Sequence, residues 1–83
     1  MKSEGLRIRG SIYTGFWIEN KFIYGTVQSG QFWIENKWIW GPFNSGLYWI
    51  EDDFIWGPKH SGEYWIENNH IFGPRNTLPW LER

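Results

Sequence analysis

The chain has 83 residues, a net charge of −1 and no cysteine, which limits it to one small domain without disulfides or thiolate-bound metal. Its balanced charge excludes a strong attraction to long nucleic acid or to a membrane surface, and we see neither a bilayer-spanning run nor a signal peptide, so we expect a soluble, cytoplasmic protein. Aromatic residues make up 22% of the chain and alanine is absent, a composition that favours strands over helices.

The first predicted element is a half unit at residues 6–13, which is similar to the second strand of the hairpins that follow it. The stretch LRIRG aligns with KWIWG at 37–41, so Ile8 takes an isoleucine position, and Arg7 and Arg9 take aromatic positions. These two arginines could stack on tryptophan rings or hold a carboxylate or phosphate. Alternatively, they keep an edge strand soluble.

Four units of sixteen residues follow without insertion, at 14–29, 30–45, 46–61 and 62–77. Such a fixed period is the signature of a repeat protein. Each unit has two short apolar runs around Asn-Lys, Asp-Asp or Asn-Asn, and these pairs tolerate the positive φ of a two-residue hairpin turn. The second run ends at Gly-Pro in three units, where proline cannot donate to the ladder. Each unit is therefore predicted to be a β-hairpin followed by a short loop.

The position of the turn predicts which residues share a face of each hairpin. In the third unit Ile50 opposes Ile55 and Trp49 opposes Trp56, and because side chains alternate along a strand these pairs lie on opposite faces. The isoleucine face carries no charge and is the predicted core. On that face Tyr48 can lie over the glycine that ends the second strand. The same ring position is taken by Phe16, Phe32 and Tyr64 in the other units.

The opposite face carries aromatic pairs with a glutamate near each turn. A flat indole beside a carboxylate suits sugar rings or nucleobases, and an exposed apolar patch typically marks a binding or assembly surface. Repetition would supply several equal sites. Alternatively, both faces are packed, within the chain or against a second subunit. The candidate ligand-binding residues on this face are Trp17, Tyr24, Trp33, Trp40, Trp49, Trp56, Trp65, Phe72, Glu19, Glu35, Glu51 and Glu67.

The later interhairpin loops supply further candidates for ligand binding. Lys59, His60 and Arg75 make these loops basic, and the nearby Ser-Gly backbone amides could cradle an anion such as phosphate. Ordinary turn chemistry explains the same loop composition without any ligand.

The last predicted element is a half unit at residues 78–83, in which Trp80 takes the ring position. The two half units are complementary, so they could pair and close a fifth unit, as a split blade closes a propeller. Alternatively, they cap the array and shield its edges. We predict one all-β domain over residues 1–83, built of tandem β-hairpin repeats in a closed, barrel-like ring or in a capped array.

The sequence contains no arrangement that indicates catalysis. His60 and His70 lie at different repeat positions, and near-identical units lack the different environments that a catalytic acid and base need. The run at 51–53 offers too few ligands for a calcium site. We therefore expect no enzyme, no catalytic residue, no cofactor and no metal site.

The predicted function is non-catalytic binding of a small ring-shaped ligand through the aromatic face, with carbohydrate first and nucleotide second. The alternative is a protein-interaction or self-assembly module, whose aromatic face is buried in a homo-oligomer or against a partner peptide.

Overall fold

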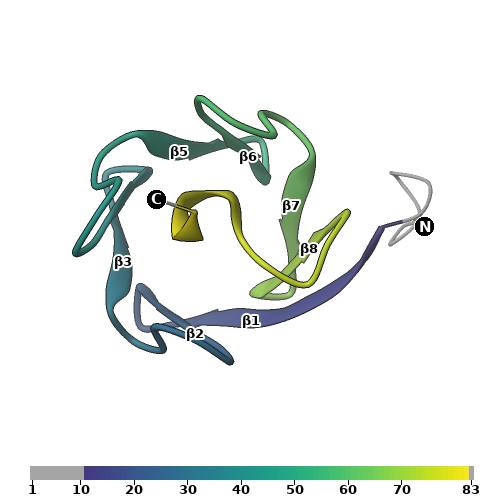
Figure 1. Cartoon of the computed structure of the whole chain (residues 1–83), viewed down its shortest axis with the longest axis horizontal. Coiled ribbons are helices and arrows are strands. Elements are labelled where there is room, and N and C mark those ends of the chain that lie inside the picture. Colours follow the sequence, from purple (N-terminus) through teal and green to yellow (C-terminus); the bar gives the residue numbers. More distant parts are fainter. Residues whose placement is uncertain (1–10, 83) are drawn as a thin grey trace.

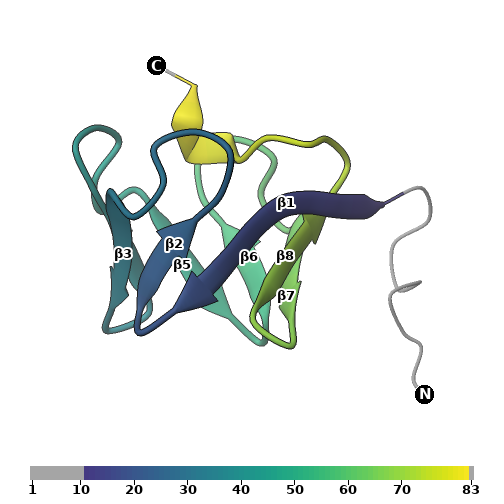
Figure 2. The same ribbon diagram turned by 90° about the horizontal axis from the view of Figure 1, so that it is seen from below.

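The computed structural model describes residues 11–82, in which four β-hairpins stand side by side around a common axis (Figure 1). The two-residue turns lie at one end of the assembly, the turn end, and the loops that join hairpins lie at the other, the loop end (Figure 2). The elements are β1 (Ile12–Glu19), β2 (Phe22–Tyr24), β3 (Phe32–Glu35), β4 (Trp38–Trp40), β5 (Tyr48–Glu51), β6 (Phe54–Trp56), β7 (Tyr64–Glu67), β8 (His70–Gly73) and a 3-10 turn, η2 (Pro79–Leu81).

Each hairpin reverses through a two-residue turn in which both residues have positive φ. Asn20 and Lys21 have φ angles of 51° and 74°, and Asp52 and Asp53 have 55° and 68°. Positive φ at both central residues is the mark of a type I′ turn, whose twist matches that of the flanking strands. Asn and Asp, which tolerate this conformation, hold the first position of every turn, and Lys21 adopts it at the second position, where glycine is usual. The predicted turns are therefore confirmed.

The register across each turn is also the predicted one. In the third hairpin Ile50 lies opposite Ile55 and Trp49 lies opposite Trp56. The other three hairpins repeat this register. The isoleucine and tryptophan pairs therefore lie on opposite faces of the sheet.

Strand β8 pairs with β1 and closes the sheet into an eight-stranded barrel. The prediction of a closed all-β ring of hairpin repeats is confirmed, and the seam pairs Ile12 and Tyr13 of the first half unit, together with the first full unit, with β8. Within residues 11–82 the two half units do not pair as a fifth hairpin: Ile12 and Tyr13 of the first half unit belong to β1, and the second half unit contains η2. Residues 6–10, which include Arg7 and Arg9, lie outside the described residues.

A threonine hydroxyl completes the ladder where the barrel closes. In the third loop the Gly62 N–H donates to the Ile55 carbonyl at 2.8 Å, and the two earlier loops have the same bond. At the seam the Thr14 hydroxyl donates to the Ile71 carbonyl at 2.7 Å and accepts the Phe16 N–H at 3.2 Å. The register of β1 against β8 shifts beside this residue. Thr14 is 3% exposed, so both bonds are formed away from water.

Isoleucines and four aromatic rings fill the barrel interior, as predicted. Ile55, for example, is 1% exposed. A Cβ atom on Gly57 would lie 2.2 Å from Cδ2 of Tyr48, so the ring can cover this position only because the residue is glycine. Phe16, Phe32 and Tyr64 cover Gly25, Gly41 and Gly73 in the same way. An eight-stranded barrel has an interior that side chains can just fill.

Residues 78–82, which we call the plug, enter the barrel at its loop end: Leu78, Pro79 and Trp80 lie in the interior, and Glu82 is exposed. The η2 turn of the plug lies at the centre of the ring in Figure 1. Leu78 and Trp80 are 1% and 0% exposed, and the Trp80 ring lies 5.7 Å from that of Tyr48 and 6.3 Å from that of Phe32. The predicted ring position of Trp80 is therefore in the core, but the residue reaches it on a 3-10 turn.

The change from hairpin to plug has a local cause. Leu78 stands sixteen residues after Gly62, whose φ of 78° helps turn the chain into the next strand. Leucine is strained at such an angle, and Leu78 instead has a φ of −117°. The following Pro79 has no N–H to donate to a ladder. The chain therefore turns inward at this point.

Candidate functional site

A continuous row of aromatic side chains, the aromatic belt, runs around the outer wall of the barrel. Trp33 lies opposite Trp40 in its own hairpin and opposite Phe22 of the preceding hairpin. The same pairing recurs around the barrel, and His70 takes the place beside Trp17 at the seam. The belt consists of Trp17, Phe22, Tyr24, Trp33, Trp38, Trp40, Trp49, Phe54, Trp56, Trp65, His70 and Phe72. It therefore brings together all eight predicted aromatic binding residues.

Neighbouring rings of the belt contact one another. Within the fourth hairpin the Trp65 and Phe72 rings are stacked, with centroids 5.6 Å apart and planes 12° apart. Between the second and third hairpins the Trp38 and Trp49 rings lie 5.3 Å apart at 48°. Such cross-strand aromatic pairs stabilise the sheet. Part of the surface of these rings is therefore covered by neighbouring rings of the belt and is not available to a ligand.

Two tryptophans of the belt are also held by backbone contacts. The Nε1–H groups of Trp40 and Trp56 donate to the carbonyls of Glu35 and Glu51, each at 3.1 Å. Their rings lie against the glycines that begin the next units, since a Cβ on Gly46 would be 3.0 Å from Cζ3 of Trp40. These two indoles therefore have a structural role in joining each hairpin to the next.

Exposure along the belt is uneven. Trp33 is 36% exposed, whereas Trp49 is half-buried and Trp65 is 0% exposed, although the three hold equivalent repeat positions. The large hydrophobic residues with high exposure, which we call the exposed sector, are Ile12, Tyr13, Trp17, Phe22, Val27, Trp33, Trp38 and Leu47. The exposed sector lies on β1–β4 and on the loops beside them.

The four predicted glutamates lie next to the turns, on the turn side of the belt. Glu19, Glu35 and Glu51 are exposed, and Glu67 is half-buried opposite His70. Each glutamate therefore lies directly opposite a ring of the belt, at the edge of the belt nearest the turns.

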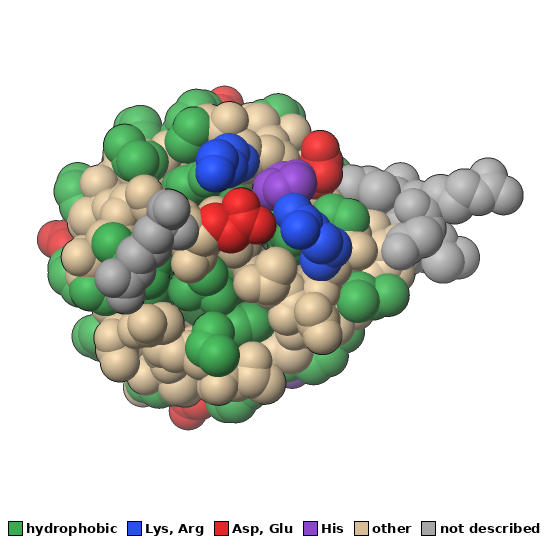
Figure 3. All heavy atoms as spheres, viewed as in Figure 1, with side chains coloured by type: hydrophobic (Ala, Val, Ile, Leu, Met, Phe, Trp, Pro, Cys, Tyr) green, Lys and Arg blue, Asp and Glu red, His purple; other side chains and the backbone are tan. Residues whose placement is uncertain are grey.

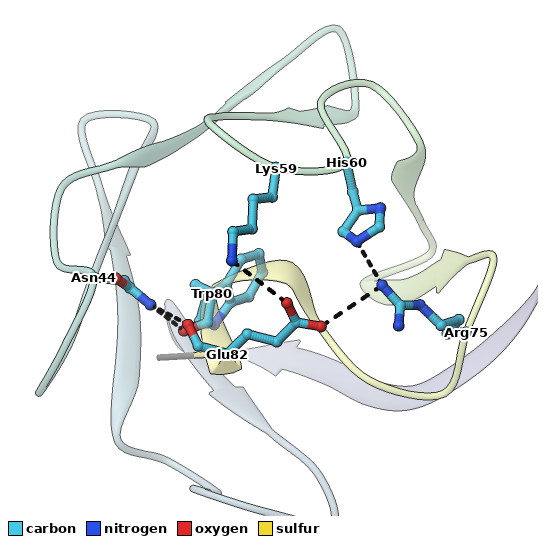
Figure 4. Close-up of polar contacts among 6 residues, drawn as sticks. All are labelled: Asn44, Lys59, His60, Arg75, Trp80 and Glu82. Atoms are coloured by element: carbon cyan, nitrogen blue, oxygen red, sulfur yellow. Dashed lines mark hydrogen bonds and ion pairs between the residues drawn. The ribbon is translucent and has the colours of Figure 1, made fainter.

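The three predicted loop residues lie apart from the belt. The opening of the barrel at its loop end, which we call the mouth, is surrounded by Lys59, His60 and Arg75 (Figure 4). The Glu82 carboxylate lies 3.8 Å from Lys59 Nζ and 3.6 Å from Arg75 Nη2 (Figure 4). His60 contacts Arg75 through Nε2 and lies 3.2 Å from Glu63 through Nδ1. Basic, acidic and histidine side chains are grouped over the mouth in Figure 3. The cationic loops thus face a carboxylate of the chain itself.

Asn44 holds the plug at the mouth, and sequence reasoning missed it. Both bonds come from its Nδ2 group, which donates to the Trp80 carbonyl at 3.0 Å and to the Glu82 carbonyl at 2.7 Å (Figure 4). The available signal was the replacement of a loop glycine by Leu78, followed by Pro79. That signal indicates a break in the repeat, but not which loop receives the segment.

Two tyrosines connect the core to the mouth. Desolvation by burial raises the pKa of both Tyr48 and Tyr64 above the ordinary value of 10.0. A backbone hydrogen bond from Lys59 lowers the pKa of Tyr48 by a smaller amount, and the charge of Arg75 acts in the same direction on Tyr64. Both phenols are therefore neutral at physiological pH.

Residues 11–82 contain no pocket and no group of three or more His, Cys, Asp or Glu side chains that could hold a metal ion. In the same part of the chain, no helix has the length and apolar character to cross a membrane. No protein-family model, curated protein or solved structure matches the chain. Function is therefore inferred from the exposed sector and from the mouth.

Proposed function

We propose that the chain is a non-catalytic protein-interaction module that binds a partner protein through the exposed sector. One observation carries the proposal: within residues 11–82, all the large hydrophobic side chains with high exposure lie between Ile12 and Leu47, although the repeats are nearly identical. Apolar exposure that is concentrated on one side of a domain typically marks an interaction surface.

The polar residues around the exposed sector also support an interface. Glu19, Lys21, Glu35 and Lys37 are all exposed at the turn end of the first two hairpins. A centre of tryptophan and phenylalanine with a charged, solvated border is the usual anatomy of a protein–protein interface. Tryptophans at the centre of such a surface supply much of the binding free energy.

The closed barrel determines how a partner would bind. Each of the eight described strands pairs with a neighbour on both sides, so the barrel wall has no free strand edge whose backbone could pair with a partner. A partner would therefore contact side chains and would not extend the sheet by strand addition.

Photo-crosslinking in the cells from which the protein comes tests this proposal. A photoreactive amino acid at position 33 or 38 should give one discrete polypeptide adduct, and the same amino acid at position 65 should give none. Position 65 is the matched control, because Trp65 is the repeat equivalent of Trp33 and is 0% exposed. An adduct of twice the chain's mass would identify a second copy as the partner. Equal adducts from positions 33 and 65, or none from either 33 or 38, would disprove the proposal.

A small ring-shaped ligand, carbohydrate or nucleotide, is the second candidate. It is supported by Trp17 and Glu19, which are both exposed on the outer face two residues apart. Titration of tryptophan emission with sugars and nucleotides tests it. A response that Trp17→Gln removes and Trp49→Gln retains would favour this candidate over the protein partner. A nucleotide response that falls steeply with salt would implicate the cationic loops.

A further inference from the structure

The plug is bound to the barrel as a peptide ligand would be bound. Leu78, Pro79 and Trp80 are buried among the rings and isoleucines of the core, and Leu81 packs against the same cluster. The Trp80 ring contacts come from β3 and β5, far from the plug in sequence. The interior of the barrel therefore provides an apolar socket for a short segment.

The mouth adds polar recognition to this apolar socket. The two N–H groups of the Asn44 amide are used on two backbone carbonyls of the plug, those of Trp80 and Glu82. Main-chain contacts of this kind fix the register of a bound segment. Lys59 and Arg75 flank the Glu82 carboxylate from two different loops. The segment that fills the site consists of an aliphatic residue, proline, tryptophan, a second aliphatic residue and an acidic residue, in that order.

Most of the contacts that recognise the plug come from residues outside the link that joins it to the barrel. Only residues 74–77 join the plug to β8, and Pro74, Arg75 and Asn76 are exposed. The barrel side of these contacts is supplied by Phe32, Tyr48, Asn44 and Lys59, so a plug from another molecule could meet the same residues, whereas Arg75 belongs to the link itself. Exchange of an identical element between copies is a low-cost route to association.

We propose that the mouth and interior of the barrel form a peptide-binding site, and that the plug of a second copy can occupy this site in place of the chain's own. The occupant is argued from the structure, because the chain itself carries the one segment seen to fit the site. This site is separate from the exposed sector, so the two proposals stand or fall independently.

The test uses the full chain with Trp80→Ala and a fluorescein-labelled synthetic peptide of residues 77–83. The variant should bind the peptide, as measured by fluorescence anisotropy, and its melting temperature should rise towards that of the wild-type chain. A control peptide with Trp80→Ala should bind at least about tenfold more weakly, since it lacks the buried ring. Adding Asn44→Ala to the variant should weaken binding of the wild-type peptide about tenfold.

If the variant does not fold alone, it is refolded with either peptide. Recovery of the native circular dichroism spectrum with the wild-type peptide only would support the proposal. Absence of both binding and rescue, or equal binding of the two peptides, would overturn it. Exchange between copies is measured by mixing the variant with full chains that carry Ile39→Asp, a change that should damage the barrel because Ile39 is 1% exposed and that leaves the plug sequence unaltered. A heterodimer on size exclusion supports exchange, and two unmixed species refute it.

Discussion

Replacement of Thr14 by valine tests whether the hydroxyl at the seam stabilises the closed barrel. Valine has nearly the same shape, so the change leaves no cavity but removes the bonds to the Ile71 carbonyl and from the Phe16 N–H, of 2.7 and 3.2 Å. Each such bond contributes about 0.5–1.5 kcal/mol net, so Thr14→Val should lower the free energy of unfolding by about 1–3 kcal/mol. For a domain of this size, each kcal/mol corresponds to a melting-temperature decrease of about 4–8 °C.

Urea denaturation followed by tryptophan fluorescence measures the free energy of unfolding. The slope of this free energy against urea concentration, the m-value, should be the same for the variant and the wild-type chain. Two controls separate hydrogen bonding from packing. Thr14→Ser keeps the hydroxyl and loses one methyl group, so its cost should be about 0.8 kcal/mol. Thr26→Val changes an exposed threonine and should have almost no effect. The reasoning fails if Thr14→Val unfolds within about 0.5 kcal/mol of the wild-type chain, or if the serine variant is the less stable of the two.

Three further predictions concern the rings and the plug. Gly57→Ala should destabilise the fold by about 1–3 kcal/mol in chemical denaturation, because its Cβ would lie 2.2 Å from the Tyr48 ring; an unchanged midpoint would mean that the ring moves freely. Because burial raises the pKa of Tyr48 and Tyr64 in the folded chain, the unfolded chain loses these protons first, and the free energy of unfolding should fall as the pH rises above 10.0. The double variant Tyr48→Phe/Tyr64→Phe should flatten this alkaline decline, and an identical pH profile would contradict the assignment. Asn44→Ala should cost about 1–3 kcal/mol through its two bonds to the plug, whereas Gln28→Ala, at the same position of the preceding loop, should cost less than about 0.5 kcal/mol; equal melting temperatures would show that Asn44 does not hold the plug.

The unevenness of the exposed sector shows how a nearly symmetric sequence yields one distinct surface. The same repeat position is occupied by Trp33, Trp49 and Trp65, yet the exposed fraction of the side chain falls from 36% at Trp33 to 0% at Trp65. Sequence reasoning treated the three as equal binding residues, because identical local sequence implies identical local geometry. The exposure of a side chain depends instead on which other parts of the chain pack over it. These covering residues can lie far from it in the sequence, so one repeat does not reveal them. The prediction of several equal sites consequently has no support in the exposure of these three residues.

The sequence alone determined the local features of this fold. Asn20-Lys21 and its equivalents specify the turns, the turns specify the register, and side-chain alternation then separates isoleucine from tryptophan. The fit of Tyr48 over Gly57 was predictable for the same reason, because it involves residues facing each other within one hairpin. All these features act over fewer than about sixteen residues, the length of one repeat.

Only the tertiary structure decided how the repeats are joined. Closure between β8 and β1 depends on the tilt and stagger of the whole sheet, a sum of small strand rotations that no single repeat contains. Leu78 and Pro79 break the repeat locally, but where the last segment goes is a tertiary matter: its entry into the closed barrel buries the Trp80 ring in the interior. The meeting of Lys59 and Arg75 with Glu82 followed from that entry, because ion pairs between distant residues form only where the packed chain brings the charges together.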